Sequence, residues 1–196
     1  MKLQRGRVLL RPLSPEDAPQ LFPLLDPVSW AGMAHIMPRS EAETRTHIGA
    51  LIARENSLDF AVEFDGRFVG TTCLYDIFPG LKAEIGNTYY AHDVRGTEVN
   101  PTCKLLLLSH AFEILGVQRA ALRADHRNVR SRNAILRMGA TYEGTLRSFR
   151  PSHDGTLADV DYFSILAHEW PAVKEGLEAR LLPPLPPLAS ATEILA

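Results

Sequence analysis

The sequence is poor in cysteine, which argues against two kinds of protein. Only Cys73 and Cys103 occur among the 196 residues, and they do not form a CxxC pair. This argues against a disulfide framework and against a cysteine-rich zinc site. Two isolated cysteines are typical of a protein of the reducing cytosol, so we expect a cytoplasmic location.

Long apolar runs and an excess of one charge are also missing. No apolar run approaches the roughly 18 residues that a membrane span needs. At the start of the chain, residues 1–6, charged residues recur too early for a secretory leader. Lys and Arg (21) nearly balance Asp and Glu (23), which gives a formal net charge of -2. Because a nucleic-acid-binding domain is usually strongly basic, we expect neither nucleic acid nor a membrane as a partner.

Several common catalytic motifs are absent. The chain has no G-x-S-x-G elbow, no G-x-x-x-x-G-K-[ST] loop, no H-E-x-x-H and no G-x-G-x-x-G. None of the seven histidines has another four residues away, so no helix face presents a histidine pair to a metal. We therefore expect no metal ion.

What the chain does contain is typical of one globular domain. With 45% hydrophobic and 22% charged residues, a chain of this length can bury its own core. Hydrophobic periodicity, caps and turn residues predict the order β-α-α-β-β-β-α-β-α-β-β. The predicted strands are residues 7–13, 60–64, 67–72, 82–90, 119–124, 142–149 and 159–166, and the predicted helices start at Ser14, Ser40, Pro101 and Val129.

Local signals support these boundaries. Ser14-Pro15 is a strong helix start, and Ser40 with Glu43 predicts a capping box. A loop is expected from Asp26 to Arg39, and tight Asp-Gly turns are expected at residues 65–66 and 154–155. The helix expected at 101–115 is apolar nearly all round, which predicts burial against the sheet.

The end of the chain has a different composition. A helix is expected from Ala172 to Leu182, followed by a Pro/Leu-rich segment, residues 183–188, that cannot be helical. This segment is either a ligand for a polyproline-binding groove or a solvated terminus.

Two stretches could carry chemistry. Residues 94–100 join a predicted strand to the buried helix, and a polar loop with glycine before a helix N-terminus can hold phosphate groups. An ordinary strand-to-helix turn explains the same residues. In the second stretch, residues 125–140, Asn128 is explained completely as a helix cap. A functional interpretation requires that both stretches meet at one edge of the sheet.

The order of the motifs resembles the GNAT superfamily of acetyl-CoA-dependent N-acetyltransferases, and in particular its ribosomal-protein N-terminal acetyltransferase (Rim-type) branch. The resemblance covers residues 5–171, which we expect to be the acetyltransferase domain, with 172–196 as a C-terminal helix and tail. The residues that carry it are Arg11-Pro12-Leu13, Phe68-Val69-Gly70, Glu84-Ile85-Gly86, Arg95-Gly96-Thr97, Lys104-Leu105-Leu106-Leu107, Asn128-Val129-Arg130-Ser131, Gly139-Ala140, Glu143-Gly144-Thr145-Leu146-Arg147, Tyr162-Phe163-Ser164-Ile165 and Glu169-Trp170.

The resemblance implies a fold and a donor site. The fold is α+β, a three-layer α/β/α arrangement whose mixed, mostly antiparallel sheet is splayed between the fourth and fifth strands. These strands correspond here to residues 85–90 and 119–124. The donor is acetyl-CoA, with its pyrophosphate on the loop of residues 95–100. The implied donor-binding residues are Tyr89, Tyr90, Arg95, Gly96, Thr97, Glu98, Val99, Asn100, Lys104, Asn128 and Ser131.

One departure from the family pattern concerns the phosphate loop. The family motif Q/R-x-x-G-x-G/A has small residues where this chain has Glu98 and Asn100. A glutamate repels a pyrophosphate unless its side chain turns away, and it tolerates a positive φ poorly. Backbone amides still donate at both positions, so anion binding is not abolished.

The implied reaction is attack of a neutral amine on the acetyl thioester. Backbone amides of residues 88–90 would polarise the carbonyl, and Ser131 would donate a proton to the thiolate, although a solvent-facing hydroxyl is nearly as good an explanation of that serine. No acid occupies the position of the Rim-type glutamate, so the base is left open between Glu84 and three further groups, His92, Asp93 and Asp159.

The acceptor site is expected in the loop after the first helix. Trp30, Met33 and His35 could line a groove for a peptide N-terminus, or could simply plug the edge of the sheet. Two functions stay open. The first is an N-acetyltransferase acting on a protein N-terminus or a small-molecule amine; the second is a degenerate relative that binds a CoA ester or a partner protein without turnover. A monomer and a homodimer are both compatible with the sequence.

Overall fold

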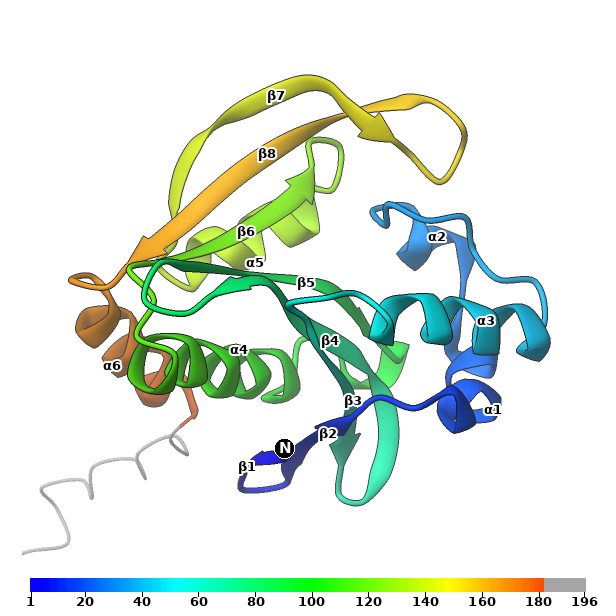
Figure 1. Cartoon of the computed structure of the whole chain (residues 1–196), viewed down its shortest axis with the longest axis horizontal. Helices are drawn as coiled ribbons and strands as arrows, with labels where there is room; N and C mark the ends of the chain where they lie inside the picture. Colours follow the sequence, from blue (N-terminus) through cyan, green and yellow to red (C-terminus); the bar gives the residue numbers. More distant parts are fainter. Residues whose placement is uncertain (182–196) are drawn as a thin grey trace, which may run out of the picture.

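The computed structural model describes residues 1–181, and its centre is a single eight-stranded sheet (Figure 1). The strand order is β1-β2-β3-β4-β5-β6-β8-β7, and every neighbouring pair is antiparallel except β5 and β6. The mixed, mostly antiparallel sheet expected from the sequence is therefore confirmed. The strands are β1 Leu3–Arg5, β2 Val8–Pro12, β3 Leu58–Phe64, β4 Arg67–Phe78, β5 Lys82–Tyr90, β6 Arg119–Asp125, β7 Thr141–Pro151 and β8 Leu157–Leu166.

Helices cover both faces of this sheet and complete three layers (Figure 1). One layer contains α1 (Ala18–Leu21), α2 (Pro27–Trp30) and α3 (Glu41–Ile52), and the other contains α4 (Val99–Ser109), α5 (Val129–Arg137) and α6 (Trp170–Leu181). The larger core lies between the sheet and α4–α6, and a smaller one around Trp30 and Ile48 lies under α1–α3. The expected α/β/α arrangement is confirmed.

The first helix differs from the prediction because prolines interrupt it. Ser14 starts a 3₁₀ turn, Pro15–Asp17, with a complete capping box, and a second 3₁₀ turn at Phe22–Leu24 follows α1. The expected loop 26–39 contains a further short helix, α2, because Asp26 accepts a hydrogen bond from the Ser29 amide at 2.8 Å. A proline suits the first position of a helix and is poorly tolerated further in, so the segment divides into short pieces.

Smaller corrections concern the ends of other elements. The helix expected at 101–115 begins at Val99 and changes into a π turn at His110–Ile114. At Ser40 the capping box is only half formed: the serine hydroxyl accepts from the Glu43 amide, but the Glu43 carboxylate accepts from Arg39 N. The Asp65-Gly66 turn is confirmed, since both residues have positive φ, 52° and 76°.

The C-terminal helix packs against the domain. Trp170, Val173 and Leu177 are buried in the same core as the sheet and α4. Leu182, expected as the last helical residue, and the Pro/Leu-rich segment 183–188 lie outside the described residues. Within residues 1–181, no helix is both long enough and apolar enough to cross a bilayer.

Candidate active site

A V-shaped gap divides the sheet between β5 and β6 (Figure 1). The two strands pair for only four residues each, from Lys82 with Arg119 to Ile85 with Leu122. Beyond these pairs β5 continues to Tyr90 beside β4, and β6 continues to Asp125 beside β8. The inner edges of both strands therefore have no strand partner, and their backbone groups can bind a ligand. The splay expected from the sequence is confirmed.

A bulge shapes the β5 side of the gap. Thr71 pairs with Tyr89 and Cys73 with Gly86, so two residues of β5 face Thr72 alone. Asn87 takes a φ of 44° there, and the hydroxyls of Thr72 and Thr88 lie 2.9 Å apart. Because a bulge turns the backbone, the β5 amides after Asn87 no longer follow the regular ladder.

The loop expected to hold pyrophosphate connects β5 to α4. Arg95 turns back and donates from Nε and Nη2 to the Tyr90 carbonyl, at 2.9 and 2.7 Å, so its guanidinium secures the end of β5. Gly96 has a φ of 80°, a conformation that favours glycine. Thr97 accepts from the Val99 amide and donates to the Val94 carbonyl. The residue before α4, Glu98, provides no side-chain cap, so the amides of the first turn other than that of Val99 are open to an anion.

Glu98 does not obstruct this loop. Its φ is -65°, an ordinary helical value, so the position needs no glycine. Its exposed carboxylate lies 3.5 Å from Nη1 of Arg7, a residue of the turn between the edge strand β1 and its neighbour β2. The side chain therefore turns towards Arg7, which removes the objection that the sequence raised.

Glu98 still places a negative charge beside the helix N-terminus, and this leads to a prediction. Glu98→Gln should lower the KM for acetyl-CoA about two- to fourfold, because one exposed charge contributes up to about 1 kcal/mol there. The difference should shrink as ionic strength rises. Asp65→Asn, which removes the other carboxylate bound to Arg7, should leave KM unchanged. An unchanged KM in Glu98→Gln would mean that this carboxylate does not sense the phosphates.

The β6 side of the gap leads into α5. Asn128 caps this helix, since its Oδ1 accepts from the Ser131 amide at 3.0 Å. The amide nitrogen of Asn128, Nδ2, lies against Gly32. A Cβ atom added to this glycine would be only 2.3 Å from that nitrogen. Ser131 is half-buried in the first turn of α5. The two sequence stretches that we singled out thus lie on the two sides of one gap.

Four side chains form a cluster across the base of the gap, on the sheet face opposite α4. They are Glu84, Tyr75, Arg123 and Tyr162. Glu84 Oε1 accepts from Tyr75 Oη and from Arg123 Nε, while Arg123 also donates to the hydroxyls of Tyr75 (2.6 Å) and Tyr162 (3.0 Å). Burial raises the pKa of Tyr75, so the phenol keeps its proton. Among residues 1–181 the second carboxylate oxygen, Oε2, has no hydrogen-bond partner. Glu84 lines a polar cavity of about 540 Å³.

The other candidate bases lie elsewhere. Asp93 is exposed and pairs with Arg67, and His92 is exposed beside it in the turn before the phosphate loop. Asp159 accepts from the Ser148 amide and secures the β7–β8 hairpin. Of the four candidates left open by the sequence, only Glu84 lies at the gap. The sequence did not indicate Tyr75, Arg123 or Tyr162; the charged Arg123 between the apolar neighbours of a strand was the one available signal.

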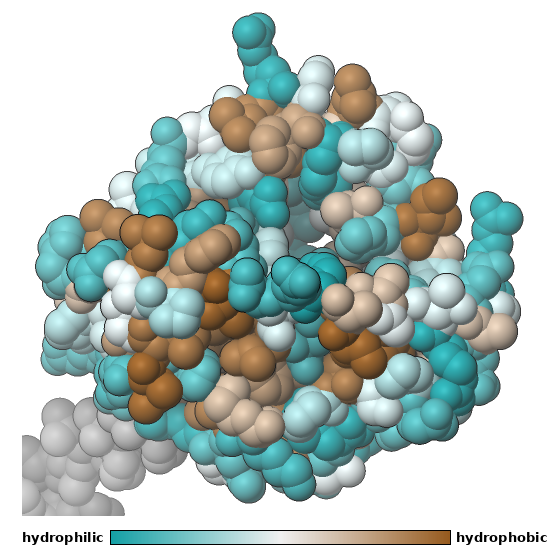
Figure 2. Space-filling model, in the orientation of Figure 1, coloured by the Kyte–Doolittle hydropathy of each residue, from teal (hydrophilic) through white to brown (hydrophobic). Residues whose placement is uncertain are grey.

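The loop with the expected acceptor residues closes the open end of the gap. Trp30 is only 2% exposed; it packs on Tyr89 and donates from Nε1 to the His35 carbonyl at 2.6 Å. It therefore shapes the loop from inside. Met33 is half-buried and His35 exposed. Arg150 of β7 donates to the carbonyls of Gly32 and Met33. In Figure 2 a hollow separates the surface over α2 from the surface over β6–β8.

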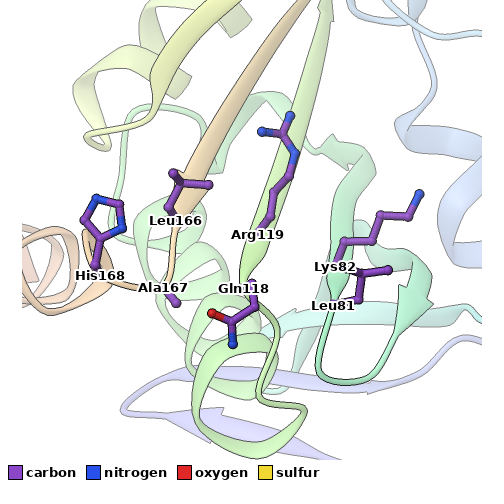
Figure 3. Close-up of a pocket in the computed structure, with 7 residues that line it drawn as sticks. All are labelled: Leu81, Lys82, Gln118, Arg119, Leu166, Ala167 and His168. Carbon is purple, nitrogen blue, oxygen red and sulfur yellow. The ribbon is translucent and has the colours of Figure 1, made fainter.

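Another hollow, of about 750 Å³, lies at the opposite end of the strands (Figure 3). Its lining comes from the start of β5, the start of β6 and the end of β8, where β5 and β6 are still paired. It therefore lies away from the gap and from the α4 N-terminus. Within the described residues no group of three His, Cys, Asp or Glu side chains could hold a metal ion.

Comparison with known proteins agrees with this geometry. Residues 7–141 match the family model "Acetyltransferase (GNAT) domain". The chain belongs to the GNAT acetyltransferase family. It is 30% identical over 120 residues to "Putative ribosomal N-acetyltransferase YdaF" of Bacillus subtilis (strain 168), a match that spans 61% of this chain and 64% of YdaF.

Solved structures share this GNAT fold over almost the whole chain. A "putative acetyltransferase" from T. thermophilus superposes with a TM-score of 0.87 and 32% identity, over 92% of this chain and 97% of that one. RimJ of Mycobacterium smegmatis, in complex with CoA-disulfide, has a TM-score of 0.78 and 23% identity over 92% and 93% of the two chains. At 23% identity, the similarity to RimJ shows a shared fold and nothing more.

Proposed function

We propose that this protein transfers the acetyl group of acetyl-CoA to a primary amine by direct attack in a ternary complex. The observation that carries the proposal is the β5–β6 gap. It has the N-terminus of α4 on one side and the Glu84 cavity on the other. An anionic donor and an amine acceptor then approach each other from opposite faces of the sheet.

The donor is assigned to the helix side of the gap. The backbone amides of Gly96, Thr97, Glu98 and Asn100 bind the pyrophosphate, helped by the dipole of α4 and by the Glu98 side chain being turned away. Tyr90 of β5 and Lys104 of α4 are buried on this side. The ring of Tyr89 packs on Trp30 on the other face, so Tyr89 offers the donor only its backbone. Asn128 offers its amide nitrogen to the pantetheine arm, because its oxygen already caps α5. Acetyl-CoA supplies the activated acyl group.

The acceptor is assigned to the opposite face. Glu84 accepts the proton of the attacking amine on Oε2, while Arg123 and Tyr75 keep the carboxylate in place through Oε1. Backbone amides of residues 88–90 bind the developing oxyanion. Ser131, in the first turn of α5, is the hydroxyl that the sequence suggests as the proton donor to the thiolate. Met33 and His35 lie on the loop that encloses the acceptor, and Trp30 supports that loop.

For the acceptor we propose a protein N-terminus, on the strength of the relationship to YdaF, whose name states a ribosomal N-acetyltransferase. A small-molecule amine is the alternative. The match spans less than two thirds of YdaF, so the protein N-terminus is a proposal for this chain, and no further activity or partner is taken from that relative. The cytoplasmic location and a homodimer likewise stay predictions.

The test is a transfer assay with the purified full-length chain. Acetyl-CoA is incubated with N-terminal peptides, polyamines and amino acids, and thiol release is followed together with the mass of each acceptor. An acceptor that gains one acetyl group for each thiol released supports the proposal. Binding of acetyl-CoA without release over every acceptor would instead support the degenerate relative, and absence of binding would exclude both.

A further inference from the structure

Lys104 is a charged side chain that is buried beside the gap. It lies in α4 and is 8% exposed, and its Nζ donates to Thr88 Oγ1 at 2.9 Å. No carboxylate among residues 1–181 forms an ion pair with it. Burying an unpaired ammonium costs several kcal/mol, so such a group is rare unless it serves a purpose.

The neighbours of Lys104 do not neutralise it. They are Cys103 on α4 and Cys73 on β4, and Cys103 in turn lies beside Tyr90 on β5. Burial raises the pKa of each thiol to about 11, and it also raises the pKa of Tyr90, so all three stay protonated and uncharged. The same burial lowers the pKa of Lys104 to about 8. The ammonium thus keeps its charge at neutral pH and can release a proton readily.

The position of the Lys104 ammonium relates it to the carbon–sulfur bond of the acyl donor. Thr88 lies in the bulged part of β5, between Glu84 on the same strand and the phosphate loop that follows it. On the proposed path of the acyl donor, from the α4 N-terminus towards the Glu84 cavity, the thioester end passes Thr88. An ammonium has three N–H donors, and Thr88 accepts one of them.

We propose that Lys104 is the acid that protonates the departing thiolate of coenzyme A. This inference rests on the proposed function and replaces Ser131 in that role. As the amine nitrogen bonds to the acetyl carbon, the carbon–sulfur bond breaks and its electron pair goes to sulfur. Lys104 gives that sulfur a proton, Glu84 takes one from the amine, and water restores both groups after the thiol leaves.

The first test needs no turnover. The wild-type protein is titrated with CoA and with desulfo-CoA, which lacks the thiol, in buffers of different ionisation enthalpy. We expect CoA to bind about threefold more tightly than desulfo-CoA near pH 8 and to release protons, because the charge lowers the pKa of the thiol, about 8.5 for a free thiol, by about one unit. Equal affinities with no proton release would overturn the proposal, even if no acceptor has been found.

The second test compares Lys104→Met with Lys174→Met, a control on the surface of α6. We expect Lys104→Met to lower kcat about 100-fold with little change in the KM for acetyl-CoA, and to abolish the preference for CoA over desulfo-CoA. Since it removes an unpaired buried charge, it should also raise the melting temperature. The control should leave kcat and the CoA preference unchanged.

Three outcomes contradict this role. A kcat within threefold of wild type would exclude Lys104 as the acid. Equal losses of affinity for CoA and desulfo-CoA would make it a binding group for the pantetheine arm. An acetyl group on Lys104 after incubation with acetyl-CoA, detected by peptide mass spectrometry, would make it an acceptor. A wild-type protein that transfers to no amine but shows the thiolate preference would refute the proposed function and the acid role with it, while showing that Lys104 stabilises a bound thiolate.

Discussion

Glu84→Gln is expected to lower kcat roughly 100- to 1,000-fold, since general base catalysis by a positioned carboxylate contributes about that much. Glutamine can keep its oxygen towards Tyr75 and Arg123, and it then places an NH₂ group where Oε2 accepted the proton. The geometry is thus retained while the basic atom is lost. Steady-state rates for one acceptor, together with a thermal melt, measure both effects.

The matched control for this variant is Glu143→Gln. Glu143 also binds an arginine of β6, Arg119, but at the closed end of the strands. We expect its activity to stay within twofold of wild type. In addition, Glu84→Gln should lose the fall of kcat/KM at acid pH, because that fall reports protonation of the base. Activity within threefold of wild type would reduce Glu84 to an anchor for Arg123.

Gly70→Ala is expected to lower the free energy of unfolding by about 3–4 kcal/mol, one of the largest effects that a single methyl group can have here. Gly70 has a φ of 151°, and a Cβ atom would lie 2.0 Å from the Tyr89 carbonyl oxygen and 2.9 Å from Tyr90 Cα. These are backbone atoms of β5, so no side chain can move away to make room. For a domain of this size the melting temperature should fall by about 10 °C.

Gly49→Ala is the control for this substitution. Gly49 lies inside α3, its φ is not positive, and a Cβ atom there meets nothing within 4 Å. Alanine should therefore stabilise the protein by up to about 1 kcal/mol, through its higher helix propensity. Chemical denaturation measures both variants. A loss below about 1 kcal/mol in Gly70→Ala would show that β5 can move away from β4.

Local signals predicted most of the fold. The Asp65-Gly66 turn, the serine caps and the start of α5 at Asn128 depend on residues a few positions apart, and all of them are present. The first helix was predicted less well, because its prolines divide it into 3₁₀ and α pieces whose lengths depend on packing under Trp30. The extra edge strand β1 has only three residues, too few for a periodic pattern.

The site was less predictable because its contacts are long-range. Glu84 and Arg123 are 39 residues apart in the chain, and Arg150 is 117 residues from Met33. The family motif indicated the phosphate loop, but not the ion pair that turns Glu98 towards Arg7, 91 residues away. Trp30 was expected either to line the acceptor groove or to plug the edge of the sheet, and only the packing reveals that its ring is buried.

The short β5–β6 ladder makes the sheet two half-sheets joined by a hinge. Five strands lie on one side and three on the other, and four paired residues on each strand are the only ladder that connects them within residues 1–181. The Glu84–Arg123 ion pair crosses this joint at its base, and the bonds from Arg150 to the Gly32–Met33 carbonyls cross it at the open end. Side chains, and not the ladder, therefore set the width of the opening into which both substrates must fit.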